Sequence, residues 1–250
     1  LARTRRNGAL SLRAHPDDAE FRCAGTLARL RAADWEVHIV SATAGDCGSI
    51  THDADEISRI RLGEGKAAAE LIGATYHCLG EKDLRVVYCR EAIERTINLF
   101  RDIAPSLVFS HARLDYMLDH EQTHLLARCA SFGYAAPNAS SRPVREGSAV
   151  PHLYYCDPLE AANPYTGEAV QPTTLIDISD VIETKVAMLA AHASQREWLR
   201  AHHGTDEYLD AMRRHGEMRG KVLGVQYAEA FCLHRGHPYP QNDLLQELLG

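Results

Sequence analysis

The sequence predicts an α/β fold, with a mostly parallel sheet flanked by helices and a carboxyl-terminal extension of further strands and helices. Through the first 135 residues, short apolar runs alternate with longer segments of helical periodicity. The 250 residues are 45% hydrophobic, which suffices for one substantial core. Because alternation of this kind builds βαβ units with right-handed crossovers, we expect one twisted sheet.

Each expected element has its own pattern. Segment 17–33 places Phe21, Leu27 and Leu30 on one face and begins with acidic residues, which suits the helix dipole. Gly73 and Pro105 stand where later helices should end. In this part of the chain we expect strands at 9–14, 36–43, 75–79 and 106–110, and helices at 17–33, 57–71, 90–103 and 121–130.

The second half continues with a loop at 137–151 that is rich in Pro, Ser and Asn. The tail from 227 holds a short apolar run and two prolines. We expect one domain over 1–250, with a core at about 9–135 and an extension at about 150–250 that borders a cleft. Within the extension we expect strands at 152–156 and 174–178 and helices at about 179–202 and 206–222.

The composition excludes some function classes. A formal net charge of -7 argues against a nucleic-acid partner. The sequence has no run of about 18 consecutive apolar residues, so we expect no transmembrane helix. We also expect no signal peptide before the first strand. Seven scattered cysteines without a Cys-x-x-Cys pair indicate reduced thiols. We therefore expect a cytoplasmic protein and leave a homo-oligomer open.

The sharpest motif is His15-Pro16-Asp17-Asp18, where the first strand ends and the first helix begins. Imidazole nitrogen and carboxylate oxygen both bind zinc, at about 2.0–2.2 Å. Pro16 helps to bend the chain there, and Asp17 is left beside the ion as a candidate general base. Two consecutive aspartates at a helix start are equally typical of helix capping.

A second cluster, Asp119-His120, follows the fourth strand. Ligands of parallel sheets bind beyond the carboxyl ends of the strands, so the loops after the first, second and fourth strands should share one crevice. Capping alone does not explain two such clusters at one edge. A nucleotide site is disfavoured, because no Gly-x-Gly-x-x-Gly follows the first strand and the two aspartates would repel a pyrophosphate.

The segment His15–Glu20, with the loop 43–48 and the pair Arg61 and Glu64, resembles the LmbE/PIG-L family of metal-dependent N-acetylglucosaminyl deacetylases over roughly residues 9–130. The resemblance implies a Rossmann-like sheet and hydrolysis of the N-acetyl (or N-acyl) group of an amino sugar. It implies Zn2+, or another divalent metal, on His15, Asp18 and His120, with Asp17 as the base. We expect Asp119 to orient a ligand histidine.

One departure concerns the second motif, because Met117 and Leu118 stand where many family members have His and Pro. That histidine is associated with the tetrahedral intermediate or the leaving amine. Either another group replaces it or Asp17 is both base and acid. The candidates for replacement are His234, placed first, and His237, His124 and His111.

The expected substrate-binding residues are Arg61, Asp46 and His234. We expect Arg61 either to reach substrate hydroxyls or a charged group of the substrate, or to pair with Glu64 on its own helix. For Trp35 and Trp198 we expect either stacking on a sugar ring or packing in the core. The strings 115–117, 157–159 and 227–231 resemble deacetylases of glycopeptide-antibiotic sugars. The alternatives to an amino-sugar deacetylase are an amidase of the same family that acts on a thiol-sugar conjugate and a non-catalytic metal-binding homologue.

Overall fold

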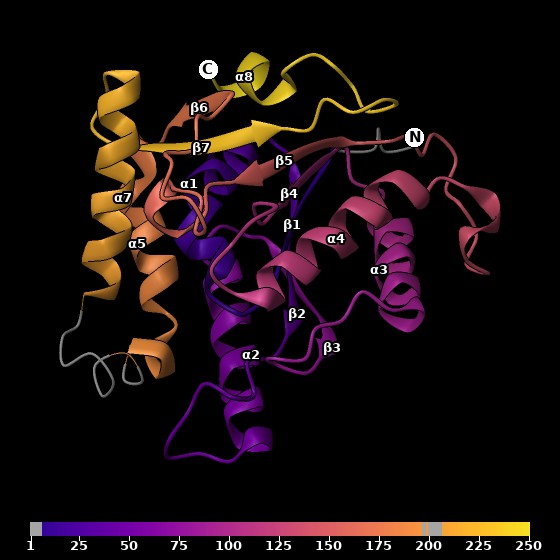
Figure 1. The fold of residues 1–250 in the computed structure, drawn as a ribbon, viewed down its shortest axis with the longest axis horizontal. Coiled ribbons are helices and arrows are strands. Elements are labelled where there is room, and N and C mark those ends of the chain that lie inside the picture. Colours follow the sequence, from indigo (N-terminus) through magenta and orange to yellow (C-terminus); the bar gives the residue numbers. More distant parts are fainter. Residues whose placement is uncertain (1–6, 197–198, 200–206) are drawn as a thin grey trace.

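A computed structural model describes residues 7–196, 199 and 207–250 of the chain. Within these residues seven strands form one sheet in the order β3-β2-β1-β4-β5-β7-β6 (Figure 1). The first five strands in the chain pair in parallel, and β7 pairs antiparallel with both β5 and β6. The strands are β1 Gly8–Arg13, β2 Glu36–Thr43, β3 Thr75–Glu81, β4 Leu107–Ser110, β5 His152–Cys156, β6 Thr174–Asp177 and β7 Ala228–Leu233.

Helices cover both faces of the sheet (Figure 1). One face packs against α3 and α4, and the other against α1, α2, α5, α7 and α8. The α-helices are α1 Asp18–Ala32, α2 Ala54–Glu70, α3 Arg90–Ile103, α4 Leu118–Gly133, α5 Ile182–Ala190, α7 Tyr208–Leu223 and α8 Leu244–Leu249. Single 3-10 turns lie at Pro137–Ala139, Leu159–Ala161 and Ser179–Val181.

Strand β1 shows why the sheet is buried. Ala9 joins the core on the α1 face, whereas Leu10 and Leu12 join the core on the α3 face. Every residue of β1 is buried, as parallel strands between two helical layers require. The predicted α/β fold is thereby confirmed, and strands of the carboxyl-terminal part extend the same sheet.

The expected ranges 36–43, 90–103 and 152–156 coincide with β2, α3 and β5. The tail needs a correction, because its apolar run is a full strand, β7, inserted between β5 and β6. The charged residue Glu229 interrupts the apolar pattern of this strand. Its side chain is nevertheless buried inside β7, where it accepts a hydrogen bond from Lys185 Nζ at 2.5 Å.

The expected helix 179–202 is interrupted: it begins as a 3-10 turn, α5 ends at Ala190, and helical residues resume at 193–196 after a turn. Trp198 and the expected helix start at 206 lie outside the described residues. Trp35 is buried in the core. All seven cysteines are free. No helix among the described segments has the length and apolar character that crossing a membrane requires.

Candidate metal centre

A cavity of about 620 Å³ opens at the carboxyl edge of the sheet. The loops after β1, β2 and β4 reach it, as expected, and the loop after β3 joins them. Its opposite wall comes from the carboxyl-terminal part of the chain. The residues that line it are His15, Asp17, Asp18, Phe21, Arg22, Cys47, Gly48, Arg61, Asp83, Leu84, Tyr116, Met117, His120, Leu159, Gln195, Leu199, Glu207, Tyr208 and Ala211.

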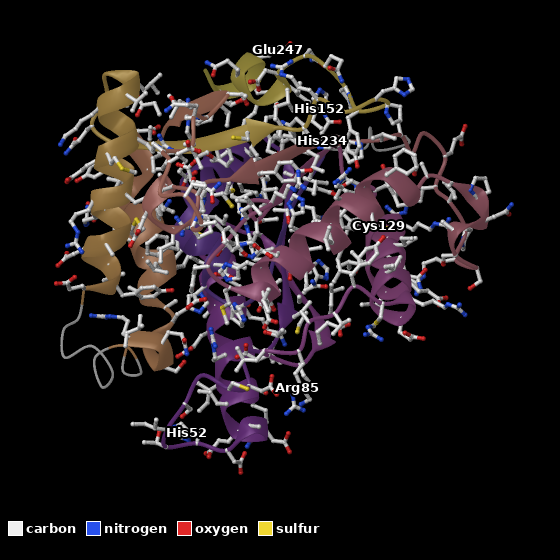
Figure 2. The ribbon with its side chains drawn as sticks, viewed as in Figure 1. His52, Arg85, Cys129, His152, His234 and Glu247 are labelled. Atoms are coloured by element: carbon white, nitrogen blue, oxygen red, sulfur yellow. The ribbon has the colours of Figure 1, made fainter. Side chains whose placement is uncertain are left out.

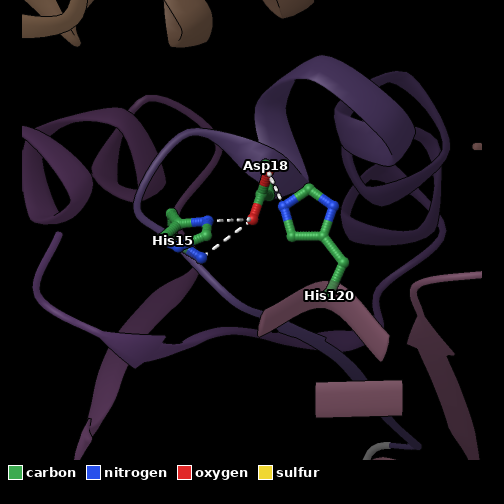
Figure 3. A group of neighbouring side chains, drawn as sticks. All are labelled: His15, Asp18 and His120. Atoms are coloured by element: carbon green, nitrogen blue, oxygen red, sulfur yellow. Dashed lines mark hydrogen bonds and ion pairs between the residues drawn. The ribbon is translucent and has the colours of Figure 1, made fainter. Parts of the chain in front are cut away.

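His15, Asp18 and His120 meet at one point, with one ligand atom of each within 4.8 Å of the others (Figure 3). Oδ2 of Asp18 lies 3.3 Å from Nδ1 of His15, and its Oδ1 lies 3.5 Å from Nε2 of His120. The backbone N–H of His15 also donates to Asp18 Oδ2 at 2.8 Å. The two sequence-distant motifs are therefore brought together around the Asp18 carboxylate.

The outer nitrogens of both histidines are held by other carboxylates. Nε2 of His15 donates to Asp83 at 3.0 Å and approaches Asp119 at 3.4 Å. Nδ1 of His120 donates to Asp115 at 2.9 Å. Asp119 is itself fixed by the backbone N–H groups of Leu84 and Val86. This is the carboxylate–histidine arrangement that fixes the tautomer and orientation of metal ligands.

The cluster fits a divalent metal ion. Nε2 of His120 is buried and has no hydrogen-bond partner among the described residues, although it faces Asp18. A buried nitrogen of this kind calls for a partner, and an ion between the imidazoles and Asp18 supplies one. Two overlapping groups, His111–Asp115–His120 and His15–Asp83–Asp119, also meet the distance criterion. The carboxylates of these two groups already accept hydrogen bonds from the histidines, so we favour His15–Asp18–His120 as the metal site.

Charge complementarity sets the titration of the cluster. Burial opposes protonation of His15, but hydrogen bonds to Asp119, Asp18 and Asp83 raise its pKa well above the usual range. Burial also opposes ionisation of Asp18, but His120, His111 and His15 hold its pKa well below the usual range. The site therefore attracts positive charge, whether a proton or a metal ion.

Asp17 stands at the N-cap position of α1, yet its side chain makes no capping hydrogen bond. Its φ of 102° is in the left-handed region, which costs a non-glycine residue of order 1–3 kcal/mol. The carboxylate instead accepts from Tyr208 Oη at 2.7 Å and lies 3.5 Å from Arg61 Nη2. Burial raises the pKa of Asp17, opposed by the charge of Arg61. Helix capping does not explain these contacts.

Arg61 is buried and donates to the backbone oxygens of Pro16 and Gly45. The expected pairing with Glu64 is not formed, because Glu64 accepts from the N–H and hydroxyl of Ser194. A Cβ on Gly45 would lie 2.0 Å from Arg61 Nη1. The glycine loop therefore makes room for the guanidinium group.

Asp46, an expected substrate-binding residue, does not line the cavity. Its carboxylate accepts from the backbone N–H of Asp83 at 2.8 Å and lies 3.4 Å from Lys82 Nζ. These contacts turn Asp46 toward the loop after β3, so the structure does not bring it into the cavity, and substrate binding by Asp46 stays a prediction. Asp46 therefore positions that loop, which carries Asp83 to the metal centre.

His234, the other expected substrate-binding residue, also lies outside the cavity and near His152 (Figure 2). Strand β7 runs antiparallel to β5, with Leu233 paired to Tyr154, so the end of β7 reaches the amino end of β5. There the backbone N–H of His234 donates to Leu153 O at 2.8 Å. Its Nδ1 lies 2.9 Å from the hydroxyl of Tyr155. The structure does not bring His234 into the cavity, because the cavity opens at the opposite, carboxyl edge of the sheet, and substrate binding by His234 stays a prediction.

The other candidates for the missing histidine do not line the cavity either. Nε2 of His111 accepts the N–H of Ala14 at 2.9 Å, and burial beside His120 lowers the pKa of His111 to about 3. Nδ1 of His124 donates to the backbone oxygen of His111. His237 does not line the cavity. Met117 does line it, and His15 and His120 are the histidines that do so among the described residues.

Sequence reasoning missed two contacts. Asp83 was overlooked because its strand, β3, had no motif of its own, although its position two residues after Glu81 at a strand's carboxyl end was an available signal. Tyr208 was overlooked because it lies 191 residues from Asp17. No local pattern in the sequence marks that pairing.

Comparison with known proteins accounts for this arrangement. Residues 10–131 match the family PIG-L, described as GlcNAc-PI de-N-acetylase. Over these residues, just under half of the chain, the sequence is similar to the PIG-L family. The matched span carries His15, Asp17, Asp18 and His120, so the resemblance stated from the sequence is confirmed, and with it an enzyme of the hydrolase type.

Two curated relatives of this chain have different activities. A diacetylchitobiose deacetylase of Thermococcus kodakarensis is 28% identical over 74% of this chain and 69% of its own length. A 4-oxalmesaconate hydratase of Pseudomonas putida is 25% identical over 93% of this chain and 89% of its own.

Solved structures agree on the fold. The N,N'-diacetylchitobiose deacetylase of Pyrococcus horikoshii aligns with a TM-score of 0.77 at 25% identity, over 95% of this chain and 88% of its own. A deacetylase of the teicoplanin biosynthesis pathway aligns with a TM-score of 0.67 over 93% and 100%. At 15% identity, the latter likeness shows the fold alone.

Proposed function

We propose that this protein is a zinc-dependent hydrolase that removes the N-acetyl or N-acyl group of an amino sugar. The observation that carries the proposal is the placement of Asp17 in the same cavity as the His15–Asp18–His120 cluster. The cluster suits the metal ligands, and the adjacent carboxylate suits a general base.

The chemistry follows from the needs of amide hydrolysis. His15, Asp18 and His120 would hold a divalent ion, which would lower the pKa of water toward about 7 and supply positive charge for the acyl oxygen. Asp17 accepts a proton from the attacking water. Arg61 and Tyr208 hold the Asp17 carboxylate toward the cavity, and Asp119 and Asp115 hold the ligand imidazoles.

The leaving amine also needs a proton. Met117 occupies the position of the usual histidine, and the remaining cavity histidines are the proposed metal ligands. Asp17 therefore returns the proton to the nitrogen as the C–N bond breaks, and the products are a carboxylate and a free amine. The raised pKa of Asp17 suits a group that both accepts and gives a proton.

An amino sugar is the favoured substrate because the 28% identical relative is a diacetylchitobiose deacetylase. A glycopeptide-antibiotic sugar has weaker support, since the teicoplanin-pathway neighbour shares the fold at only 15% identity. The seven free cysteines support a reducing compartment.

A hydratase is the second candidate, favoured by the 25% identity to 4-oxalmesaconate hydratase over 93% of this chain. The two reactions differ in their products. A hydrolase splits its substrate into an amine and an acid, whereas a hydratase adds water and releases no second product.

The test is Asp17→Asn in the zinc-loaded protein, assayed for release of acetate and free amine from N,N'-diacetylchitobiose. We expect kcat to fall by about 10²–10⁴-fold, while the zinc content stays that of the wild type. Asp55→Asn, an exposed aspartate on α2, is the matched control. Full activity of Asp17→Asn would overturn the mechanism, and a wild type that releases neither product from any acylated sugar would overturn the hydrolase.

A further inference from the structure

Arg22 lies in the first half of α1 and lines the cavity. Its guanidinium carbon lies 4.9 Å from the ring centroid of Phe21. Arg22 and Asp18 are separated by four positions on one helix, so they share a face, with Cβ atoms about 5–6 Å apart. A positive charge therefore stands one helical turn from the proposed metal ligand.

The guanidinium group of Arg22 is incompletely satisfied. Its Nη1 is buried and has no hydrogen-bond partner among the described residues. Burial lowers the pKa of Arg22, against the charges of Asp115, Asp18 and Asp157, which raise it. A buried donor without an acceptor is costly and uncommon in proteins.

The nearest carboxylates are engaged elsewhere. Asp18 faces His15 and His120, Asp115 accepts from His120, and Asp157 accepts from Arg219 Nε at 2.5 Å. Oδ1 of Asp157 is also buried without a partner among the described residues. A pairing between Asp157 and Arg22 is therefore the alternative explanation for the unpartnered Nη1 of Arg22. Unlike Asp157, Arg22 lines the cavity.

A second donor supports a ligand in this cavity. Nε of Arg61 is likewise buried without a hydrogen-bond partner in the described part of the chain, and Arg61 lines the same space. The wall beside Arg22 carries Phe21, Tyr116 and Leu159, so the charge lies against apolar side chains. A charged donor in such surroundings binds an anionic acceptor more strongly than a neutral one.

We propose that Arg22 is a specificity-determining residue that binds an anionic group, a carboxylate or a phosphate, on the same sugar unit that carries the N-acyl group. The inference rests on the proposed function and narrows its substrate class to acidic N-acyl amino sugars. The single helical turn between Asp18 and Arg22 limits the separation of the acyl and anionic groups to one sugar unit.

The test compares matched sugars that differ in charge. The carboxylate pair is N-acetylmuramic acid and its methyl ester, and the phosphate pair is N-acetylglucosamine 6-phosphate and N-acetylglucosamine. In wild type we expect kcat/KM for the anion to exceed that for the neutral partner by about 10- to 100-fold, the range for hydrogen bonds to charged groups. The pair with the larger ratio identifies the anion.

Arg22→Gln should bring this ratio to about one, and Arg22→Lys should keep part of it. The ratio is independent of the folded fraction, so a partly unfolded variant still reports. Arg31→Gln, on the same helix and outside the cavity, should leave the ratio unchanged. A wild-type ratio near one, or an unchanged ratio in Arg22→Gln, would overturn the inference.

Binding separates this inference from the proposed function. Calorimetric titration of the zinc-loaded protein with each sugar pair should show the same preference and its loss in Arg22→Gln. Charge-dependent binding without acetate release would reject the hydrolase and keep the anion site. Acetate release without charge preference would reject the anion site alone.

Discussion

Each imidazole of the His15–Asp18–His120 cluster has two nitrogens with different partners. One faces Asp18, and the other donates to Asp83 and Asp119 or to Asp115. Because these carboxylates fix each ring, the three ligand atoms are arranged before an ion arrives. Preorganisation of this kind lowers the cost of binding, and loss of one such partner typically reduces metal affinity or activity about 10–100-fold.

Tyr208→Phe tests how Asp17 is positioned. The variant removes the hydrogen bond to Asp17 Oδ2 and keeps the ring against Phe21. We expect kcat to fall about 10-fold with a smaller change in KM, because a hydrogen bond to a charged group contributes about 1.5–3 kcal/mol. Steady-state kinetics measures both constants.

The matched control is Tyr165→Phe, at an exposed tyrosine, which should behave as wild type. An unchanged kcat in Tyr208→Phe would show that Arg61 alone suffices to orient Asp17.

At the scale of elements, a buried charge ties three of them together. Glu229 of β7 accepts from the N–H groups of Gly25 and Thr26 in α1 and pairs with Lys185 of α5. Since α1 begins at the metal centre and carries Arg22, this contact holds the helix that positions the site against the sheet.

Glu229→Gln tests that contact. Removing one partner of a buried pair leaves the other charge uncompensated, at a cost of about 3–5 kcal/mol. We expect the free energy of unfolding in urea to fall by about that amount.

Glu183→Gln is the contrast, because its pair with Arg213 is exposed and should contribute at most about 1 kcal/mol. Equal effects of the two substitutions would contradict a special role of Glu229.

The β7 strand also shows where sequence reasoning stops at this scale. The periodicity of 36–43 and 90–103 placed β2 and α3 correctly because apolar spacing alone defines them. The run Ala228–Leu233 is interrupted by Glu229, whose burial depends on Lys185, 44 residues away. A local pattern does not contain that partner.

At the scale of the whole molecule, the sheet brings His38 of β2 beside His77 of β3, with Nδ1 and Nε2 3.1 Å apart. Burial and the neighbouring imidazole lower the pKa of His38 to about 4. Burial lowers the pKa of His77 as well. The pair is therefore neutral in the folded protein at neutral pH.

This pair predicts a pH dependence of stability. Between about pH 6.5 and pH 4, His38 is protonated in the unfolded chain but not in the folded protein. The free energy of unfolding therefore falls as pH falls through this range. One proton gives a slope of at most about 1.4 kcal/mol per pH unit. His38→Gln should reduce the slope of the urea unfolding free energy over this window, and an unchanged slope would contradict the lowered pKa.

The sequence by itself determined the α/β class, the crevice at the carboxyl edge and the His15, Asp18 and His120 cluster. These follow from local periodicity and from the rule that parallel strands end at one edge. Tertiary structure alone decided the contacts of Asp83 and Tyr208, the burial of Arg22 Nη1, the position of His234 outside the cavity and the place of β7. Those depend on which distant groups meet, and on which buried donors and charges find a partner when the chain packs.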